Sequence, residues 1–163
     1  MSQQKSGLSF LWLSAVAFVL DLLTKYIVVQ KFALYESVNI LPVFNLTYVH
    51  NTGAAFSFLA DHDGWQKFFF IGLAVVISSM LIYFMAKSEA AQKLQNAAYA
   101  LIIGGALANA VDRAYNGYVI DFFDFYWRDW RYPVFNVADI AICVGAALIA
   151  LDAFKQGKKQ EQK

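Results

Sequence analysis

The sequence is poor in charged residues, cysteine and histidine, and each shortage narrows the class of protein. Of 163 residues, 15% are charged and 60% are apolar, whereas a soluble domain has about 25% charged and about 45–50% apolar residues. The single cysteine excludes an internal disulfide and a cysteine-based metal cage. The formal net charge is +1, so nothing points to a nucleic-acid partner. What remains is a chain whose apolar surface needs a solvent other than water.

The apolar residues gather in four long runs, at about 8–29, 65–86, 94–113 and 135–154. Because a helix rises about 1.5 Å per residue and the hydrocarbon core is about 30 Å thick, about 20 residues span a bilayer. A buried soluble bundle is the alternative, but four such runs leave almost no polar outer face. We therefore expect an all-α integral membrane protein, a single domain over residues 1–163 with four transmembrane helices.

The first run has a second interpretation, a cleavable signal peptide that begins near Lys5 and ends at Ala15-Val16-Ala17. The apolar stretch continues well past Ala17, which favours a retained helix. The distribution of Lys and Arg favours both termini in the cytoplasm. Segments of about 31–64 and 114–134 would then lie on the periplasmic side of the inner membrane.

These two outer segments carry strand and turn signals. Residues 43–50 alternate apolar and polar side chains, which is typical of a strand, and Asn51-Thr52-Gly53 follows as a turn. A short helix is expected over 54–59, and residues 51–64 would form a lid. Residues 118–125 are rich in β-branched and aromatic residues, and the Trp-rich stretch after them is typical of a membrane–water interface. We expect small extracytoplasmic β elements and a short helix beside the four spans.

Charged and amide side chains within the runs need an explanation, because an ionised group near the bilayer centre costs at least about 2.5–3.5 kcal/mol. Asp21 and Lys25 are four residues apart on one helix face, so they either form a mutual ion pair or support a site, or both. Gly105, Asn109 and Arg113 form one stripe of the third run. Close helix packing accounts for the glycine, and an interface anchor is the alternative for Arg113.

Two aspartates near the outer ends of the last two runs are the candidate reactive groups. Asp121 lies in an apolar strand, and Asp124, its competitor, points to the opposite face of that strand. Asp139 follows Asn136 by three residues at the start of the fourth run, where helix capping is the plainer explanation. Two carboxylates held together share one proton, so the ionised member can activate water while the protonated member donates to a carbonyl oxygen.

Other chemistries have less support in the sequence. His50 and His62 are the only histidines, both lie in the first outer segment, and their spacing does not suit a metal, so we expect no metal and no cofactor. Cys143 is expected to be a packed residue of the fourth helix. A small proton-coupled transporter is the alternative from another class, because intramembrane Asp and Arg also mark ion pathways. Transport would favour charges near the midplane and broken helices.

Five motifs occur in order along the chain: Asp21–Lys25, Asn51–Ser57, Gly104–Arg113, Val119–Phe122 and Phe135–Asp139. Together with the four apolar runs, they closely resemble the bacterial lipoprotein signal peptidase family, signal peptidase II. The resemblance covers nearly the whole chain. Ala108 departs from the family pattern, which usually has glycine before the asparagine.

The resemblance implies an intramembrane aspartyl endopeptidase that removes signal peptides from diacylglyceryl-modified prolipoproteins, cleaving just before the lipidated cysteine at the periplasmic face. Asp121 and Asp139 would be the catalytic pair, and Asp124 would not take part. Expected partners are the prolipoprotein, membrane lipids and globomycin-type cyclic peptide inhibitors. The residues expected to bind substrate or support the pair are Asn51, Gly53, Asn109, Arg113, Asn136, Asp21 and Lys25.

Overall fold

The structure is a computed structural model that describes residues 6–53 and 64–161. The four apolar runs form long helices, each long and apolar enough to cross a membrane. A 3-10 turn, η1 (Gly7–Phe10), leads into the first of them. The helices are α1 (Leu11–Lys31), α2 (Gln66–Lys87), α3 (Lys93–Asn116) and α4 (Val137–Glu161).

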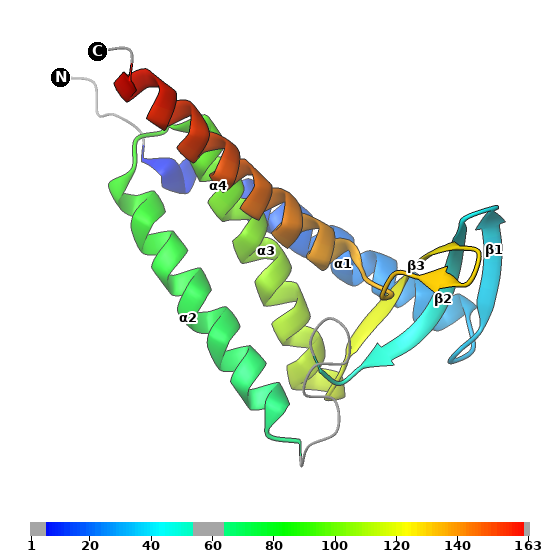
Figure 1. The fold of residues 1–163 in the computed structure, drawn as a ribbon. Coiled ribbons are helices and arrows are strands. Elements are labelled where there is room, and N and C mark those ends of the chain that lie inside the picture. Colours follow the sequence, from blue (N-terminus) through cyan, green and yellow to red (C-terminus); the bar gives the residue numbers. More distant parts are fainter. Residues whose placement is uncertain (1–5, 54–63, 162–163) are drawn as a thin grey trace.

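Helix α3 packs against each of the other three helices. Its close approach to α4 depends on Gly105, because a Cβ there would collide with the carbonyl oxygen of Ala138. Gly104, one residue earlier, lies in the same way against Ser14 of α1. Helices α2 and α4, by contrast, diverge from the end where the chain termini lie (Figure 1). One side of α4 is therefore left open near its first turns.

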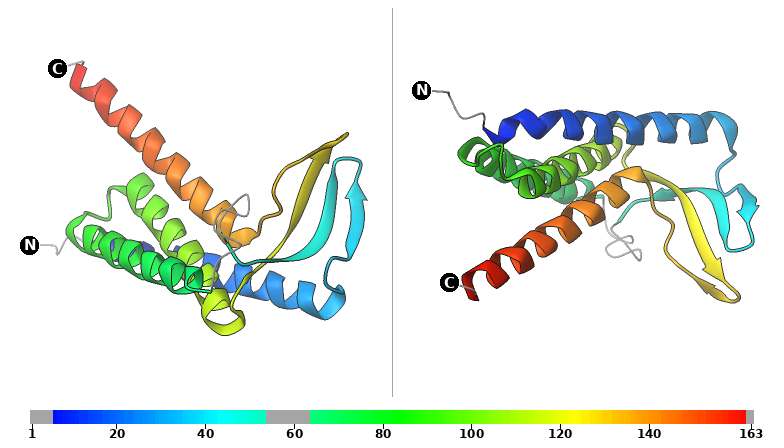
Figure 2. Two further views of the ribbon diagram at one scale, coloured as in Figure 1. Left: turned by 60° about the horizontal axis from the view of Figure 1, so that its bottom comes forward. Right: turned by 90° about the horizontal axis from the view of Figure 1, so that it is seen from above.

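An antiparallel sheet in the order β1-β2-β3-β4 lies at the end of the helices opposite the termini (Figures 1 and 2). Its register places Val49 opposite Asp121 and Asn45 opposite Asp124, with an irregularity between Leu46 and Val49. The strands are β1 (Ser37–Leu41), β2 (Phe44–Asn51), β3 (Val119–Trp127) and β4 (Trp130–Arg131).

The two faces of β3 have different neighbours. Ile120 and Phe122 are buried in a cluster with Val28, near the end of α1, and Tyr48 of β2. Asp121, between them, faces the other way, into a cavity beside α3 and α4. The alternation of the strand thus decides which polar side chains of β3 reach that cavity.

The turns at either end of β3 fix its position relative to the helices. Helix α3 continues to Asn116, beyond the expected end at 113, because Gly117 is the residue that terminates it: its φ is +84° and its N–H donates to the carbonyl of Arg113. After the sheet, Phe135 exchanges backbone hydrogen bonds with Phe123 of β3 directly before α4 begins. The start of α4 is therefore tied to the middle of β3.

The short helix expected over 54–59 and most of the expected lid lie outside the described residues.

Candidate active site

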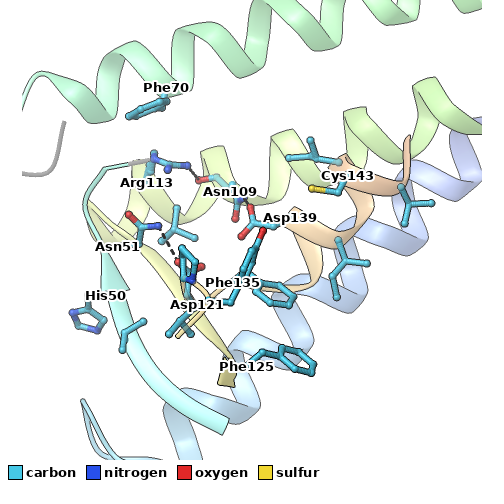
Figure 3. Close-up of a pocket in the computed structure, with 18 of the residues that line it drawn as sticks. His50, Asn51, Phe70, Asn109, Arg113, Asp121, Phe125, Phe135, Asp139 and Cys143 are labelled. Carbon is cyan, nitrogen blue, oxygen red and sulfur yellow. Dashed lines mark hydrogen bonds between the residues drawn. The ribbon is translucent and has the colours of Figure 1, made fainter. Parts of the chain in front are cut away.

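A cavity of about 940 Å³ lies between β2, β3, α3 and the first turns of α4. One end of its wall is polar, with Asn51, Asn109, Arg113, Asp121 and Asp139 (Figure 3). The remaining wall is mainly apolar and aromatic and is formed by Val49, Phe70, Phe125, Trp130, Tyr132, Phe135, Ile140 and Val144, among others. Such a cavity, apolar with a few convergent polar groups, is typical of a ligand site.

Asp121 is almost completely buried, with 1% of its surface exposed, and two amides hold its carboxylate. Asn51, the last residue of β2, donates from Nδ2 to Oδ2 at 2.9 Å. Asn136, directly before α4, donates from Nδ2 to Oδ1 at 2.6 Å. Each carboxylate oxygen thus has a fixed partner, so the orientation of the group is set by the fold.

Asp139 lies in the first turn of α4, where it forms a reciprocal cap with Asn136. The Asp139 N–H donates to Asn136 Oδ1 at 2.9 Å, and the Asn136 N–H donates to Asp139 Oδ2 at 3.2 Å. This is the capping-box arrangement. Asp139 Oδ1 also accepts from Asn109 Nδ2 at 2.9 Å. Capping and a place in the site, which the sequence left as alternatives, are therefore combined in the same two residues.

Asn109 and Asn136 join the two aspartates in one network. Asn136 Nδ2 donates to Asn109 Oδ1 at 3.1 Å as well as to Asp121. Because Asn109 in turn donates to Asp139, the two amides bridge the carboxylates. The structure brings Asp121 and Asp139 into one cavity, as the sequence led us to expect.

Burial dominates the electrostatics of Asp121. Loss of solvent raises its pKa to about 7, and the nearby charge of Asp139 acts in the same direction. The amides of Asn51 and Asn136 and the positive charge of Lys25 act against this rise, because each stabilises the ionised form. Asp121 is therefore poised to gain or lose a proton near neutral pH, which suits acid–base chemistry.

Arg113 points into the cavity, and this orientation contradicts a role as a plain interface anchor. Its guanidinium carbon lies 4.7 Å from the ring centroid of Phe70 on α2, a cation–π contact. Its Nη2 donates to the carbonyl of Gly53 at 2.8 Å. The Gly53 N–H donates to Asn51 Oδ1 at 3.1 Å, so Arg113 also fixes the amide that holds Asp121.

Asp21 and Lys25 form the expected ion pair, with Nζ and Oδ2 2.6 Å apart and both side chains buried. A third member, Asp112, was not singled out from the sequence. Its Oδ2 lies 2.9 Å from Lys25 Nζ and accepts the Ile120 N–H at 3.2 Å. The cost of a charge within an apolar helix was the signal that would have identified Asp112.

Two other cavity residues were missed or misplaced by sequence reasoning. His50 lines the cavity but stacks on Tyr118 and exchanges a 2.8 Å hydrogen bond with the hydroxyl of Tyr48. Burial lowers the pKa of His50, so the ring is neutral at neutral pH.

The expectation that Cys143 is packed is wrong. It is exposed and lines the cavity, because the divergence of α2 from α4 leaves this face of α4 uncovered.

Asp124 lies on the other face of β3, away from the cavity. It accepts hydrogen bonds from Thr47 Oγ1 at 2.7 Å and Arg131 Nη1 at 2.9 Å. Of the two aspartates, Asp121 lines the cavity and Asp124 does not. Among the described residues, no three His, Cys, Asp or Glu side chains are grouped in a way that could hold a metal ion.

Comparison with known proteins gives one consistent family. Residues 13–155 match the family described as Signal peptidase (SPase) II. The "Lipoprotein signal peptidase" of Haemophilus influenzae (strain PittGG) is 78% identical over 159 residues, which cover 98% of this chain and 93% of that protein. The protein of the same description from Pasteurella multocida (strain Pm70) is 71% identical over 163 residues, covering 100% and 99% of the two chains.

The fold is also similar to solved structures. One is described as "Bacterial membrane enzyme structure by the in meso method at 2.3 A resolution". It aligns with a TM-score of 0.85 and 29% sequence identity, covering 95% of this chain and 93% of the other. A second, determined by the same method at 1.9 Å, aligns with a TM-score of 0.82 and 27% identity.

Proposed function

The chain belongs to the signal peptidase II family of aspartic proteases, and from this premise we propose that Asp121 and Asp139 are its catalytic pair. The observation that carries the proposal is the shared amide bridge. Asn136 donates to Asp121, caps α4 together with Asp139, and contacts Asn109, which donates to Asp139. Two carboxyl groups are thereby presented to one cavity, where the ionised one can accept a proton from water and the protonated one can donate to a substrate carbonyl oxygen.

The pair performs hydrolysis by dividing the proton transfers between its members. The ionised carboxylate takes a proton from water as the water oxygen attacks the carbonyl carbon of the scissile peptide bond. The protonated carboxylate donates its proton to the carbonyl oxygen. Collapse of the tetrahedral intermediate then breaks the C–N bond. The carboxyl that took the proton from water delivers it to the leaving amine, and the other carboxylate takes back the proton of the hydroxyl as the carbonyl re-forms. The Asp121 pKa of about 7 supports this sharing of one proton at neutral pH.

The substrate that we propose is a prolipoprotein whose lipobox cysteine carries a diacylglyceryl group. The curated relatives are described as lipoprotein signal peptidases. The cavity has a polar end at the aspartates and an apolar wall that includes Ile140 and Val144, both exposed on α4. The scissile bond would lie at the polar end while the acyl chains follow the apolar wall into the surrounding membrane lipid. Globomycin-type cyclic peptides would compete for the same cavity.

We further propose that both termini lie in the cytoplasm and that the sheet and the aspartates lie at the periplasmic face of the inner membrane. The Lys/Arg distribution supports this orientation. Exposed Trp127 and Trp130, which pair between β3 and β4, suit the headgroup region of the same face.

The transporter considered from the sequence is not supported. The related proteins are peptidases and the similar structures are membrane enzymes. The aspartates also lie beside the sheet at one end of the helices, where a translocated signal peptide is accessible, and not along a path through the bundle.

The proposed reaction is tested with the purified protein in lipid vesicles and a synthetic prolipoprotein substrate with or without the diacylglyceryl group. We expect cleavage before the modified cysteine, little cleavage of the unmodified substrate, and no cleavage by Asp139→Asn. Full processing by a folded Asp139→Asn protein would contradict the role of the pair.

The orientation is tested by labelling single cysteines from outside intact cells, in a Cys143→Ser background. A cysteine at Asp129, in the exposed turn between β3 and β4, should react with a membrane-impermeant maleimide. A cysteine at Gly157, near the end of α4, should react only after the cells are permeabilised. Labelling of position 157 in intact cells would reverse the proposed topology.

A further inference from the structure

The buried cluster of Lys25, Asp21 and Asp112 lies behind the cavity, and nothing in the proposed hydrolysis uses its charges. All three residues are at most 5% exposed. Lys25 Nζ lies 2.6 Å from Asp21 Oδ2, 2.9 Å from Asp112 Oδ2 and 2.8 Å from Asn109 Oδ1. An ammonium has three donors, and here each one has an oxygen from α1 or α3.

The two carboxylates of this cluster each hold the backbone at one particular place. Asp21 Oδ1 accepts the N–H of Ala138 at 2.7 Å, and Ala138 directly precedes Asp139. Asp112 Oδ2 accepts the N–H of Ile120 at 3.2 Å, and Ile120 directly precedes Asp121. The cluster therefore fixes the peptide unit before each member of the pair, although one lies at the start of a helix and the other in a strand.

The third contact of the ammonium determines which way the Asn109 amide points. Asn109 Oδ1 accepts from both Lys25 Nζ and Asn136 Nδ2. With two donors on its oxygen, the amide must turn its NH₂ group toward Asp139 Oδ1, to which it donates at 2.9 Å. A flipped amide would place its carbonyl oxygen against the Asp139 carboxylate and its NH₂ against the ammonium. Both contacts would be repulsive.

We infer that Lys25 is a positioning residue of the reaction: its ammonium fixes the orientation of the Asn109 amide toward Asp139, and with Asp21 and Asp112 it holds the backbone before each aspartate. The inference rests on the proposed function, because it assigns Lys25 a role in arranging the catalytic pair. An ion pair that only stabilises the fold would not link the two residues in catalysis. Our inference, by contrast, requires that the effects on kcat of substituting Lys25 and Asn109 are not independent.

The coupling is measured with Lys25→Met, Asn109→Ala and the double variant in the vesicle assay, with Lys31→Met, an exposed lysine at the end of the same helix, as the control. Each single variant should lower kcat at least about tenfold with little change in KM, because misplacing a reacting group by about 1 Å costs up to about 100-fold. The double variant should be no slower than the slower single variant, because both substitutions abolish the same fixed orientation of the Asn109 amide toward Asp139. Independent roles would instead multiply the two losses, and that result would overturn the inference.

A second variant separates positioning from charge balance. Lys25→Met leaves two buried carboxylates without a counter-ion and can fail to fold for that reason alone. The triple variant Lys25→Met/Asp21→Asn/Asp112→Asn removes all three charges and keeps an amide oxygen to accept each backbone N–H. We expect this protein to fold and still to be at least about tenfold slower than wild type. A wild-type rate would show that Lys25 only balances charge. Failure of both Lys25 variants to fold would make the cluster purely structural.

The pH dependence of kcat gives a third test, because a purely structural role of Lys25 would not change it. The charge of Lys25 lowers the pKa of Asp121, so its removal alone, in Lys25→Met, should shift the alkaline limb of kcat to higher pH. An unshifted limb would contradict the inference.

If wild type does not cleave the lipidated substrate, the proposed function fails and this inference with it. Full Lys25→Met activity beside an inactive Asp139→Asn would overturn the inference alone. Other charged or titratable groups near Asp121 include His50, Arg113 and Asp139, which line the same cavity, and Asp21 and Asp112, which contact Lys25.

Discussion

The two faces of β3 each carry one buried aspartate, and the difference between them shows why burial alone does not make a site. Asp121 and Asp124 have 1% and 0% of their surface exposed. Asp124 is paired with the guanidinium of Arg131 and the hydroxyl of Thr47. Among the described residues, the hydrogen-bond partners of the Asp121 carboxylate are neutral amides, and the charge of Asp139 lies nearby. The first arrangement gives Asp124 Oδ2 a counter-ion. The second allows Asp121 to gain or lose a proton near neutral pH.

Apart from the two aspartates themselves, the largest effect on the cavity face is expected at Asn136, because this residue contacts both aspartates. Asn136→Ala removes the donor to Asp121 and the cap on the Asp139 N–H. We expect kcat to fall about 10³-fold, within the range attributed to positioned acid–base groups, and stability to fall by about 1 kcal/mol from the lost cap. Initial rates and heat-induced loss of folded protein measure the two effects. A variant within tenfold of wild-type activity would contradict the bridging role.

The second effect is the pH dependence of the wild-type enzyme. Because the pKa of Asp121 is raised to about 7, the pair keeps its shared proton below that pH and loses it above. We expect kcat to fall about tenfold per pH unit well above pH 7, since the general acid is lost. Asp124→Asn should leave this alkaline limb in place. A rate that stays constant up to about pH 9 would show that Asp121 does not titrate in the active range.

A matched pair of asparagines compares the two faces directly. Asn51 donates to Asp121 at 2.9 Å, whereas Asn45, on the same strand, donates to Asp124 at 3.4 Å. Asn51→Ala should lower kcat about 10- to 100-fold by misplacing the carboxylate. It should also move the alkaline limb upward, because a donor that stabilises ionised Asp121 is lost. Asn45→Ala should stay within about twofold in kcat. Equal losses in the two variants would remove the distinction between the faces.

The smallest effect on catalysis is expected at Thr47, where a stability change should appear instead. Thr47→Val removes the 2.7 Å donor to the buried Asp124, which should lower the free energy of unfolding by about 1–3 kcal/mol. Thr24→Val is the control, because Thr24 donates only to backbone carbonyls of its own helix, α1. Thermal unfolding of the purified proteins measures the difference, with kcat expected within about twofold of wild type. A large loss of kcat at unchanged stability would mean that the outer face takes part in the reaction.

Much of this arrangement follows from patterns that are local in the sequence. The apolar runs predict the four helices because a span needs only length and composition. The period of two in β3 separates Asp121 from Asp124 without any knowledge of the sheet. The spacing of three between Asn136 and Asp139 predicts the cap, which is also local.

The remaining features depend on contacts between distant segments. Asp112 meets Lys25 only because α1 and α3 pack together, and Asn136 reaches Asp121 only because Phe135 pairs with Phe123. The exposure of Cys143 results from the divergence of α2 and α4. Periodicity describes one element at a time, so it contains no information on which helix covers which face.

The central claim is that the cavity-facing aspartate is catalytic and its neighbour on the opposite face is structural. Its most direct test is the initial cleavage rate of a diacylglyceryl-modified prolipoprotein by Asp121→Asn and Asp124→Asn, measured side by side in the same vesicles. Our account predicts no detectable cleavage by Asp121→Asn and a rate within a few-fold of wild type for folded Asp124→Asn. Substantial cleavage by Asp121→Asn, or an inactive but folded Asp124→Asn, would contradict it.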